Sequence, residues 1–393
     1  MFRKFDKKHI TILGIAFLIT AASYIISPIE VRFLNSLTSN TFLIGLTYAS
    51  GSILFSLISI WLGRLSDRIG RNKFIVLGVG LGIIYPILYS LVINVYQYMG
   101  IKLAWAFSAV SIGPIFSAYI QDYIKDDENK AQFMGKVYAV QSIAGAIAMY
   151  LGGTISNFFN LKATYYGASV LFVIATLVVL LSLNFNTAPI RRFRKRHIFF
   201  GLKYVFSKPQ LKFYFAINMI STLNYGIKYM LYPLIIYSLT KSDLLTGSVM
   251  ATQGVIAFFI LIFSGKIQKK FGLYPLSFIT LIILAISGNI LGVTQNIILF
   301  WIFIAVYAVG EALYGPIQAV LLIDNIESEY RGEILGIDSI FDTIFATLGP
   351  FFAGILLKII NPQQVLFTYT LLFWLGLLFS YRIYNKQIDI TKR

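Results

Sequence analysis

The chain has 393 residues, of which 58% are hydrophobic and 12% charged, and its mean hydropathy is +0.76. Soluble globular proteins are roughly half apolar and about a quarter charged, so this composition excludes a water-soluble fold and indicates an integral membrane protein. The net charge of +17 would suit nucleic-acid binding, but the cations lie between long apolar runs, so we expect no such partner.

The apolar residues form twelve runs of about 20 residues, the length at which a helix rising 1.5 Å per residue crosses roughly 30 Å of hydrocarbon. The alternation typical of a transmembrane β-barrel is absent. We therefore predict an all-α membrane protein with twelve transmembrane helices, the first of them retained because no signal-cleavage pattern follows it. In chain order the runs are 10–28, 41–62, 74–94, 99–121, 137–156, 164–183, 213–238, 244–264, 274–294, 297–323, 334–357 and 364–381.

The basic residues lie on one side of these predicted spans. All but six of the 33 Lys and Arg residues fall in the N-terminus, alternate loops, a central linker and the C-terminus. By the positive-inside rule, this asymmetry predicts a multi-pass protein of the cell membrane with both termini in the cytoplasm. The basic side would also attract anionic lipids of the bilayer. The six exceptions are Arg32, Lys102, Lys162, Lys228, Lys241 and Lys358.

One six-helix unit is written twice in the sequence. The segment "SIGPIFSAYIQDYI" aligns with "LYGPIQAVLLIDNI" in the second half of the chain. We predict two pseudo-symmetric bundles, residues 1–183 and 213–393, joined by a basic cytoplasmic linker at residues 184–212. Two such bundles can rock about a site between them. The linker segment "HIFFGLKYVF" suits either an amphipathic helix on the membrane face or a basic tether.

The connection between the second and third runs is "GRLSDRIGRNK", residues 63–73, and the second half carries a degenerate copy, "GKIQKKFG". This connection resembles the pattern G-x-L-x-D-R-x-G-R-[RK]-[RK] of the major facilitator superfamily. The resemblance implies the fold of that superfamily and a secondary active transporter that works by alternating access. The matching residues are Gly63, Leu65, Asp67, Arg68, Gly70, Arg71 and Lys73.

Within this connection, Asp67 is the one carboxylate among several cations. A carboxylate can accept hydrogen bonds from the N-terminal N–H groups of another helix. The resemblance implies that Asp67 clamps the start of the eleventh helix, near Gly332 and Glu333, in the outward-facing state. The alternative is that Asp67 neutralises the neighbouring arginines, which for exposed charges is worth only about 0–1 kcal/mol. We favour the clamp.

Three ionisable residues lie deep inside the predicted spans: Lys228, Glu311 and Asp342. Each costs about 2.5–3.5 kcal/mol when ionised at mid-depth unless a wet cavity or a partner compensates it. By resemblance, the first, fourth, seventh and tenth helices line a central cavity, so Lys228 and Glu311 would face the substrate. Polar residues recur near them at helical spacing. The resulting candidates for substrate binding are Tyr24, Asn224, Tyr225, Lys228, Tyr307, Glu311, Tyr314 and Gln318.

Asp338 and Asp342 are four residues apart and share one face of the eleventh helix. Two buried carboxylates this close can exchange a proton near neutral pH, so we predict proton coupling at Glu311, Asp338 and Asp342. Structural alternatives stay open: Asp342 could pair with Lys228, Asp338 with Arg331, and Glu311 could serve only as a partner of Lys228.

Two departures from the superfamily pattern argue against drug antiport without excluding it. Lys102 stands where relatives often carry an Arg, and it lacks the bidentate fork. Met149 stands where antiporters carry the Pro of a Gly-Pro signature in helix five. Gly145, Gly152 and Gly153 still allow close helix contact across the bundles.

We expect a monomeric secondary transporter that moves a small organic solute with protons and needs no cofactor or metal. There is no P-loop to indicate ATP drive and no cysteine for metal or thiol chemistry. An aromatic content of 16% favours multidrug-type efflux of amphipathic or cationic compounds, whereas Lys228 favours an anionic metabolite or sugar. A non-transporting receptor on the same scaffold is a further alternative. A channel or an enzyme is not expected, since rings of like charge and a catalytic set are missing.

Overall fold

The computed structural model describes residues 7–123, 127–182, 198–327 and 331–391, and within these ranges its regular elements are all helical. Helices suit a lipid environment because every backbone hydrogen bond is made inside the segment. The elements are α1 (Lys7–Tyr24), α2 (Glu30–Leu37), α3 (Thr41–Ile69), α4 (Arg71–Leu91), α5 (Val95–Val110), η1 (Ser111–Ile115), α6 (Phe116–Tyr123), α7 (Asp127–Phe158), α8 (Leu161–Ser182), α9 (Ile198–Ser207), α10 (Pro209–Thr240), α11 (Asp243–Phe271), α12 (Leu273–Val293), α13 (Ile297–Asp324), α14 (Arg331–Leu356) and α15 (Pro362–Thr391).

The helices confirm the twelve predicted runs, with two local differences. The first run ends as a helix at Tyr24, and a turn then leads into the short α2. The fourth run is interrupted by the π-helical turn η1, which contains Pro114. Proline has no N–H to donate, and a wider turn accommodates that loss. Ten helices of the described ranges are long and apolar enough to cross a membrane; α1 is shorter, and polar side chains lower the hydropathy of α10.

The duplication seen in the sequence recurs in the helix lengths. Both α3 and α11 have 29 residues, and both α4 and α12 have 21. A glycine with positive φ separates α3 from α4 (Gly70, 110°) and likewise α11 from α12 (Gly272, 78°), a backbone form that other residues rarely adopt. The exact bundle boundaries remain a prediction, and residues 184–197 of the predicted linker lie outside the described residues.

The remainder of the linker contains α9, which packs against α14 and the start of α10. Its Tyr204 hydroxyl donates to Glu327 Oε1 at 3.2 Å, and Lys208 Nζ lies 2.8 Å from the same atom. The segment is thus helical from Ile198 onward, which fits both the amphipathic-helix and the basic-tether interpretation. Its position on the membrane face stays a prediction.

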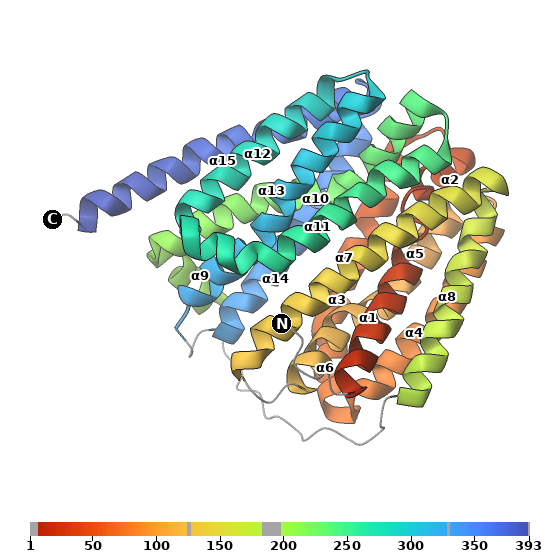
Figure 1. Ribbon diagram of the computed structural model, residues 1–393, viewed down its shortest axis with the longest axis horizontal. Helices are drawn as coiled ribbons and strands as arrows, with labels where there is room; N and C mark the ends of the chain where they lie inside the picture. Colours follow the sequence, from red (N-terminus) through yellow and green to blue (C-terminus); the bar gives the residue numbers. More distant parts are fainter. Residues whose placement is uncertain (1–6, 124–126, 183–197, 328–330, 392–393) are drawn as a thin grey trace.

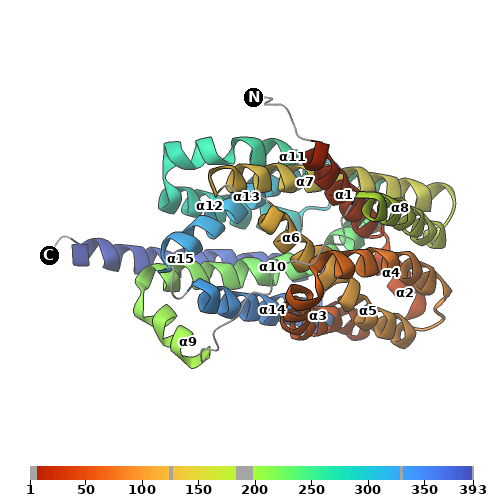
Figure 2. The same cartoon turned by 90° about the horizontal axis from the view of Figure 1, so that it is seen from below.

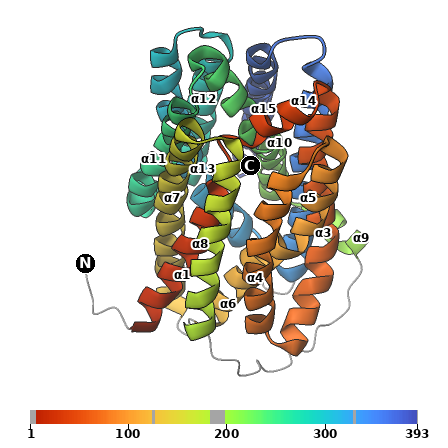
Figure 3. The same cartoon turned by 90° about the vertical axis from the view of Figure 1, so that its right-hand side faces the viewer.

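The most extensive contacts between the two halves are those of two helix pairs, α7 with α11 and α3 with α14, and α2 also contacts α10. Figures 2 and 3 show these pairs on opposite sides of the molecule. We call the end that carries the basic connections, such as residues 63–73, the basic end, and the opposite end the sealed end. Toward the basic end the halves diverge: Figure 1 shows α9 and the end of α15 at the left, and α6 with the start of α1 at the bottom.

The halves meet closely at the sealed end. Thr41 Oγ1 donates to the carbonyl of Gly354 at 3.0 Å, and the Phe42 and Phe351 rings lie 5.6 Å apart. Ser56 and Thr343 bond side chain to side chain about halfway along α3. The protein is therefore closed at the sealed end in this structure.

Gly153 of α7 and Gly247 of α11 allow the second helix pair to approach. A Cβ built at Gly247 would collide with the backbone oxygen of Met149 and lie 3.0 Å from the Cα of Gly153. Gly153 thus confirms the predicted contact across the halves. Gly145 and Gly152 do not share it: the nearest atoms to their added Cβ belong to α1 or to Ile25, in the same half.

We predict that Gly247→Leu opens the sealed end, because the new side chain has no space between α7 and α11. The chain has no cysteine, so spin labels on cysteines introduced at the exposed residues Phe158 and Ile359 report the separation of the halves. The distance should lengthen by several ångström. Gly14→Leu is the control, since a Cβ there meets nothing within 4 Å. An unchanged distance in Gly247→Leu would contradict the prediction.

Candidate functional site

Lys228 and Glu311, which the sequence places at mid-depth on different helices, form an ion pair. Lys228 Nζ lies 2.6 Å from Glu311 Oε1. Glu311 is roughly 20 Å along the axis from either end of α13 at 1.5 Å per residue. The Lys228 side chain is 9% exposed and that of Glu311 is 30% exposed. Each charge therefore compensates the other, while the Glu311 carboxylate remains exposed enough to exchange a proton or a ligand.

Tyrosines from both halves surround this pair. Lys228 Nζ lies 4.5 Å from the ring centre of Tyr225 and 5.0 Å from that of Tyr229, both within cation–π range. The Tyr229 ring in turn meets Tyr24 of α1, with ring centres 5.9 Å apart. We call Tyr24, Tyr225, Lys228, Tyr229 and Glu311 the Lys228 cluster. The predicted residues Tyr24, Tyr225, Lys228 and Glu311 are thus neighbours. The sequence analysis did not include Tyr229, although its position four residues after Tyr225 on the same helix could have indicated it.

Three further candidates continue along α13 on either side of Glu311. Tyr307 is buried, with its ring centre 6.2 Å from that of Tyr232. Tyr314 and Gln318 lie toward the basic end and are also buried. Within the described residues, the Tyr314 hydroxyl and both amide atoms of Gln318 have no hydrogen-bond partner. Buried polar groups in this state cost about 1–3 kcal/mol each, so a polar ligand would be stabilised there.

Asn224 is set apart from the other candidates. Its side-chain amide donates to the carbonyl of Ile220 at 3.0 Å and to that of Tyr369 at 3.2 Å. These bonds attach α10 to α15. These two hydrogen bonds are structural and do not involve the Lys228 cluster.

The predicted aspartate pair is bound by neutral donors of α10. The Tyr214 hydroxyl donates to Asp338 Oδ1 at 2.8 Å. Asn218 Nδ2 lies 2.8 Å from Asp342 Oδ1 and 3.3 Å from Asp338 Oδ1, and Thr222 donates to Asp342 at 3.1 Å. The alternative in which Asp342 pairs with Lys228 is wrong, because Lys228 pairs with Glu311. The side chain of Arg331, the alternative partner of Asp338, lies outside the described residues.

The first half has an ion pair of its own, which the sequence interpretation missed. Lys102 Nζ lies 2.5 Å from Glu30 Oε1 and 4.1 Å from the Tyr48 ring centre, and the Tyr98 hydroxyl donates to Glu30 at 2.8 Å. The first half therefore also contains a pair of opposite charges that compensate each other. The opposite charges of Glu30 and Lys102 were visible, but nothing in one sequence showed that α2 and α5 meet.

Asp67, in the connection at residues 63–73 that we call the motif, is bound within its own half. Arg71 donates to Asp67 Oδ1 through Nε at 3.0 Å and through a terminal nitrogen at 2.8 Å, and its other terminal nitrogen lies 2.8 Å from Asp122. Arg68 occupies the last turn of α3. With the sealed end closed, the arginine-neutralising alternative therefore applies. The clamp on α14 near Gly332 and Glu333 concerns the opposite arrangement and stays a prediction; the side chain of Glu333 lies outside the described residues.

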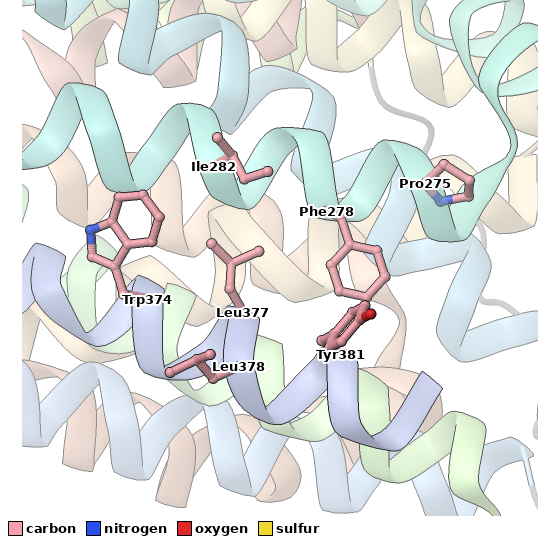
Figure 4. A pocket seen from close by; sticks show the side chains of 7 residues that line it. All are labelled: Pro275, Phe278, Ile282, Trp374, Leu377, Leu378 and Tyr381. Carbon is pink, nitrogen blue, oxygen red and sulfur yellow. The ribbon is translucent and has the colours of Figure 1, made fainter. Parts of the chain in front are cut away.

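An apolar groove of about 630 Å³ lies between α12 and α15 (Figure 4). Phe278 and Ile282 border it from α12, and Trp374 and Leu378 from α15. None of its lining residues belongs to the Lys228 cluster or to the aspartate pair. The groove therefore offers apolar contact without the charges that the candidate site supplies.

We predict that Lys228→Met lowers the stability in detergent by about 2 kcal/mol or more, because Glu311 loses its partner in a low dielectric. The double variant Lys228→Met/Glu311→Gln should regain most of this loss, since no buried charge remains. Thermal unfolding of the four proteins forms a double-mutant cycle. Additive losses would show that the two groups do not stabilise each other.

A second prediction concerns the motif. Asp67→Asn should slow exchange between conformations without changing ligand affinity, because it removes the negative charge that both Arg71 and the predicted α14 clamp require. Stopped-flow changes in label distance measure the exchange, and equilibrium binding measures the affinity. Lower affinity with unchanged exchange would reverse the assignment.

Known proteins resemble this chain along most of its length. A sequence model for the family described as Major Facilitator Superfamily matches residues 12–224 and, again, residues 213–388. An uncharacterized MFS-type transporter of Methanocaldococcus jannaschii is 22% identical over 89% of each chain. Multidrug resistance protein 2 of Bacillus subtilis is 22% identical over 90% of each chain. The crystal structure of the nucleoside transporter NupG superposes with a TM-score of 0.78 at 13% identity, covering 96% of this chain and 99% of NupG.

Proposed function

Because this chain belongs to the Major Facilitator Superfamily and is a multi-pass membrane transporter, we propose that it exports an amphipathic or cationic organic solute in exchange for protons, by alternating access. The observation that carries this proposal is the Lys228–Glu311 ion pair, enclosed by tyrosines of both halves. A proton on Glu311 or a cationic solute beside it would each replace Lys228. Two ligands that compete for one carboxylate are exchanged rather than carried together.

The surrounding residues suit such a solute. Tyr225 is 46% exposed and, with Tyr24 and Tyr229, offers aromatic faces to a cation or an apolar ring. Tyr314 and Gln318 supply unpaired polar groups. The name of the Bacillus subtilis relative, a multidrug resistance protein, supports efflux of this kind. Asp338 and Asp342 are proposed to pass protons between Glu311 and the basic end.

The second candidate function is proton-coupled transport of an anionic metabolite. It is favoured by Lys228, which would be free to bind an anion once Glu311 takes a proton. The two candidates differ in the charge of the solute that competes with the pair. A receptor on this scaffold would bind its ligand without flux. Cytoplasmic termini and a monomeric state are retained as proposals.

We predict that Glu311→Gln abolishes solute accumulation driven by a pH gradient in proteoliposomes while solute counterflow persists, because the amide cannot exchange a proton. Uptake of a lipophilic aromatic cation measures the export candidate, and uptake of an aromatic carboxylate measures the anion candidate. Glu327→Gln is the matched control. Glu327 is exposed, and the hydrogen bond from Lys208 holds its pKa below the ordinary value, so it stays ionised.

Full gradient-driven transport in Glu311→Gln would remove Glu311 from the coupling role. Transport of the carboxylate alone would select the anion candidate. Saturable binding of either compound without flux in the wild-type protein would select the receptor.

A further inference from the structure

A separate cavity of about 490 Å³ lies at the sealed end, where α2, α7 and α8 meet. Its volume falls within the roughly 300–1,000 Å³ typical of small-molecule sites and exceeds what a bare phosphate fills. Its lining shares no residue with the Lys228 cluster. It therefore requires an explanation of its own.

The charge of the lining is positive. Among the described residues, Arg32 and Lys162 both border the cavity, and no carboxylate does. Lys162 is exposed and forms no ion pair with any described residue. Asn160 uses its amide oxygen to cap α8 through the N–H of Ala163 at 2.9 Å, so its NH2 group adds donors beside the positive end of a 22-residue helix. Phe33 and Phe159 supply apolar walls.

We propose that this cavity binds an organic anion, a single carboxylate or phosphate group attached to an apolar body. Arg32 and Lys162 would contact the charged group, and Phe33 and Phe159 would pack against the body. The guanidinium of Arg32 is already held in place, since it lies 4.2 Å from the ring centre of Tyr237. A fixed guanidinium loses little freedom when it binds a planar or tetrahedral anion.

The site is coupled to the contact between the halves through Arg32. Besides lining the cavity, Arg32 forms an ion pair with Asp243 of α11, in the other half. Ser156 Oγ donates to Asp243 Oδ2 at 2.5 Å, and within the described residues Asp243 Oδ1 is buried without a hydrogen-bond partner. An anion beside Arg32 competes with Asp243 for one cation. Binding therefore weakens the closure of the sealed end, and weakening the closure strengthens binding by the same factor.

The test uses phenyl phosphate as the probe, with phenol and inorganic phosphate for comparison, and calorimetric titration of the detergent-purified protein. Lys162→Gln should weaken phenyl phosphate binding by about twofold to fivefold, which is within the range for one exposed charge contact. Lys358→Gln removes a charge from the same end outside the cavity and should bind like wild type. Asp243→Asn should bind more tightly, because the competitor for Arg32 has lost its charge.

Spin labels at Phe158 and Ile359 test the coupling. Phenyl phosphate should lengthen the distance between them in both proteins, and the concentration that gives half of the change should be higher in Lys162→Gln by the same factor as its loss of affinity. Nanodiscs distinguish two sources of the anion: weaker binding of phenyl phosphate in phosphatidylglycerol than in phosphatidylcholine identifies a lipid headgroup, and equal binding identifies a free organic anion.

Equal loss of affinity in Lys162→Gln and Lys358→Gln would overturn the site, because it would show diffuse attraction to a basic surface. Undiminished affinity in Lys162→Gln would overturn it as well, and phenol binding as tightly as phenyl phosphate would do the same. Lys162 is exposed, so its variant is expected to fold, which far-UV circular dichroism and gel filtration verify. These outcomes do not depend on which solute crosses the membrane or on Glu311.

Discussion

The cost of placing an ionised side chain in hydrocarbon is the constraint on which this structure depends. Each such group needs a partner, a wet surface or neutral donors. Lys228 meets the requirement with Glu311, and Lys102 meets it with Glu30, each pair joining two helices of one half. Because removing either member of a pair leaves the other uncompensated, these contacts fix which helices are neighbours more strongly than apolar packing alone, which is non-directional.

A different use of charge appears where the halves meet. Arg32 and Asp243 come from different halves, so this ion pair exists only while the sealed end is closed. The same region carries the close approach of Gly153 and Gly247, which requires the absence of side chains. Under the proposed alternating access, contacts inside a half can be permanent, whereas contacts between the halves at the sealed end are broken in each cycle. The exposure of the two cations fits this difference. Arg32, which pairs across the halves, is partly exposed and borders a cavity, whereas Lys228, which pairs within one half, is almost completely buried.

The sequence predicted the helices because a span in lipid has a fixed length and an apolar composition, and it predicted that Lys228 and Glu311 need compensation for the same reason. It did not predict the bonds of Asn224, because a polar residue on a helix face can serve a neighbouring helix as readily as a ligand. The Glu30–Lys102 pair was missed because its members lie 72 residues apart, and one sequence gives no distance between helices. Helical spacing, by contrast, was enough to place Tyr225 beside Lys228.

The proposed exchange requires that Glu311 respond to the arrangement of the halves as well as to its ligand. Tyr24 of the first half contacts Tyr229 of the second, and Tyr229 lies against Lys228, so the partner of Glu311 is in contact with a chain of rings that crosses the interface. When the halves rock, that ring contact must change, and the surroundings of Lys228 change with it. The free energy of the ion pair then differs between the two arrangements. A proton or solute that replaces Lys228 at Glu311 therefore shifts the equilibrium between them, which is the condition for coupling ligand exchange to a conformational change.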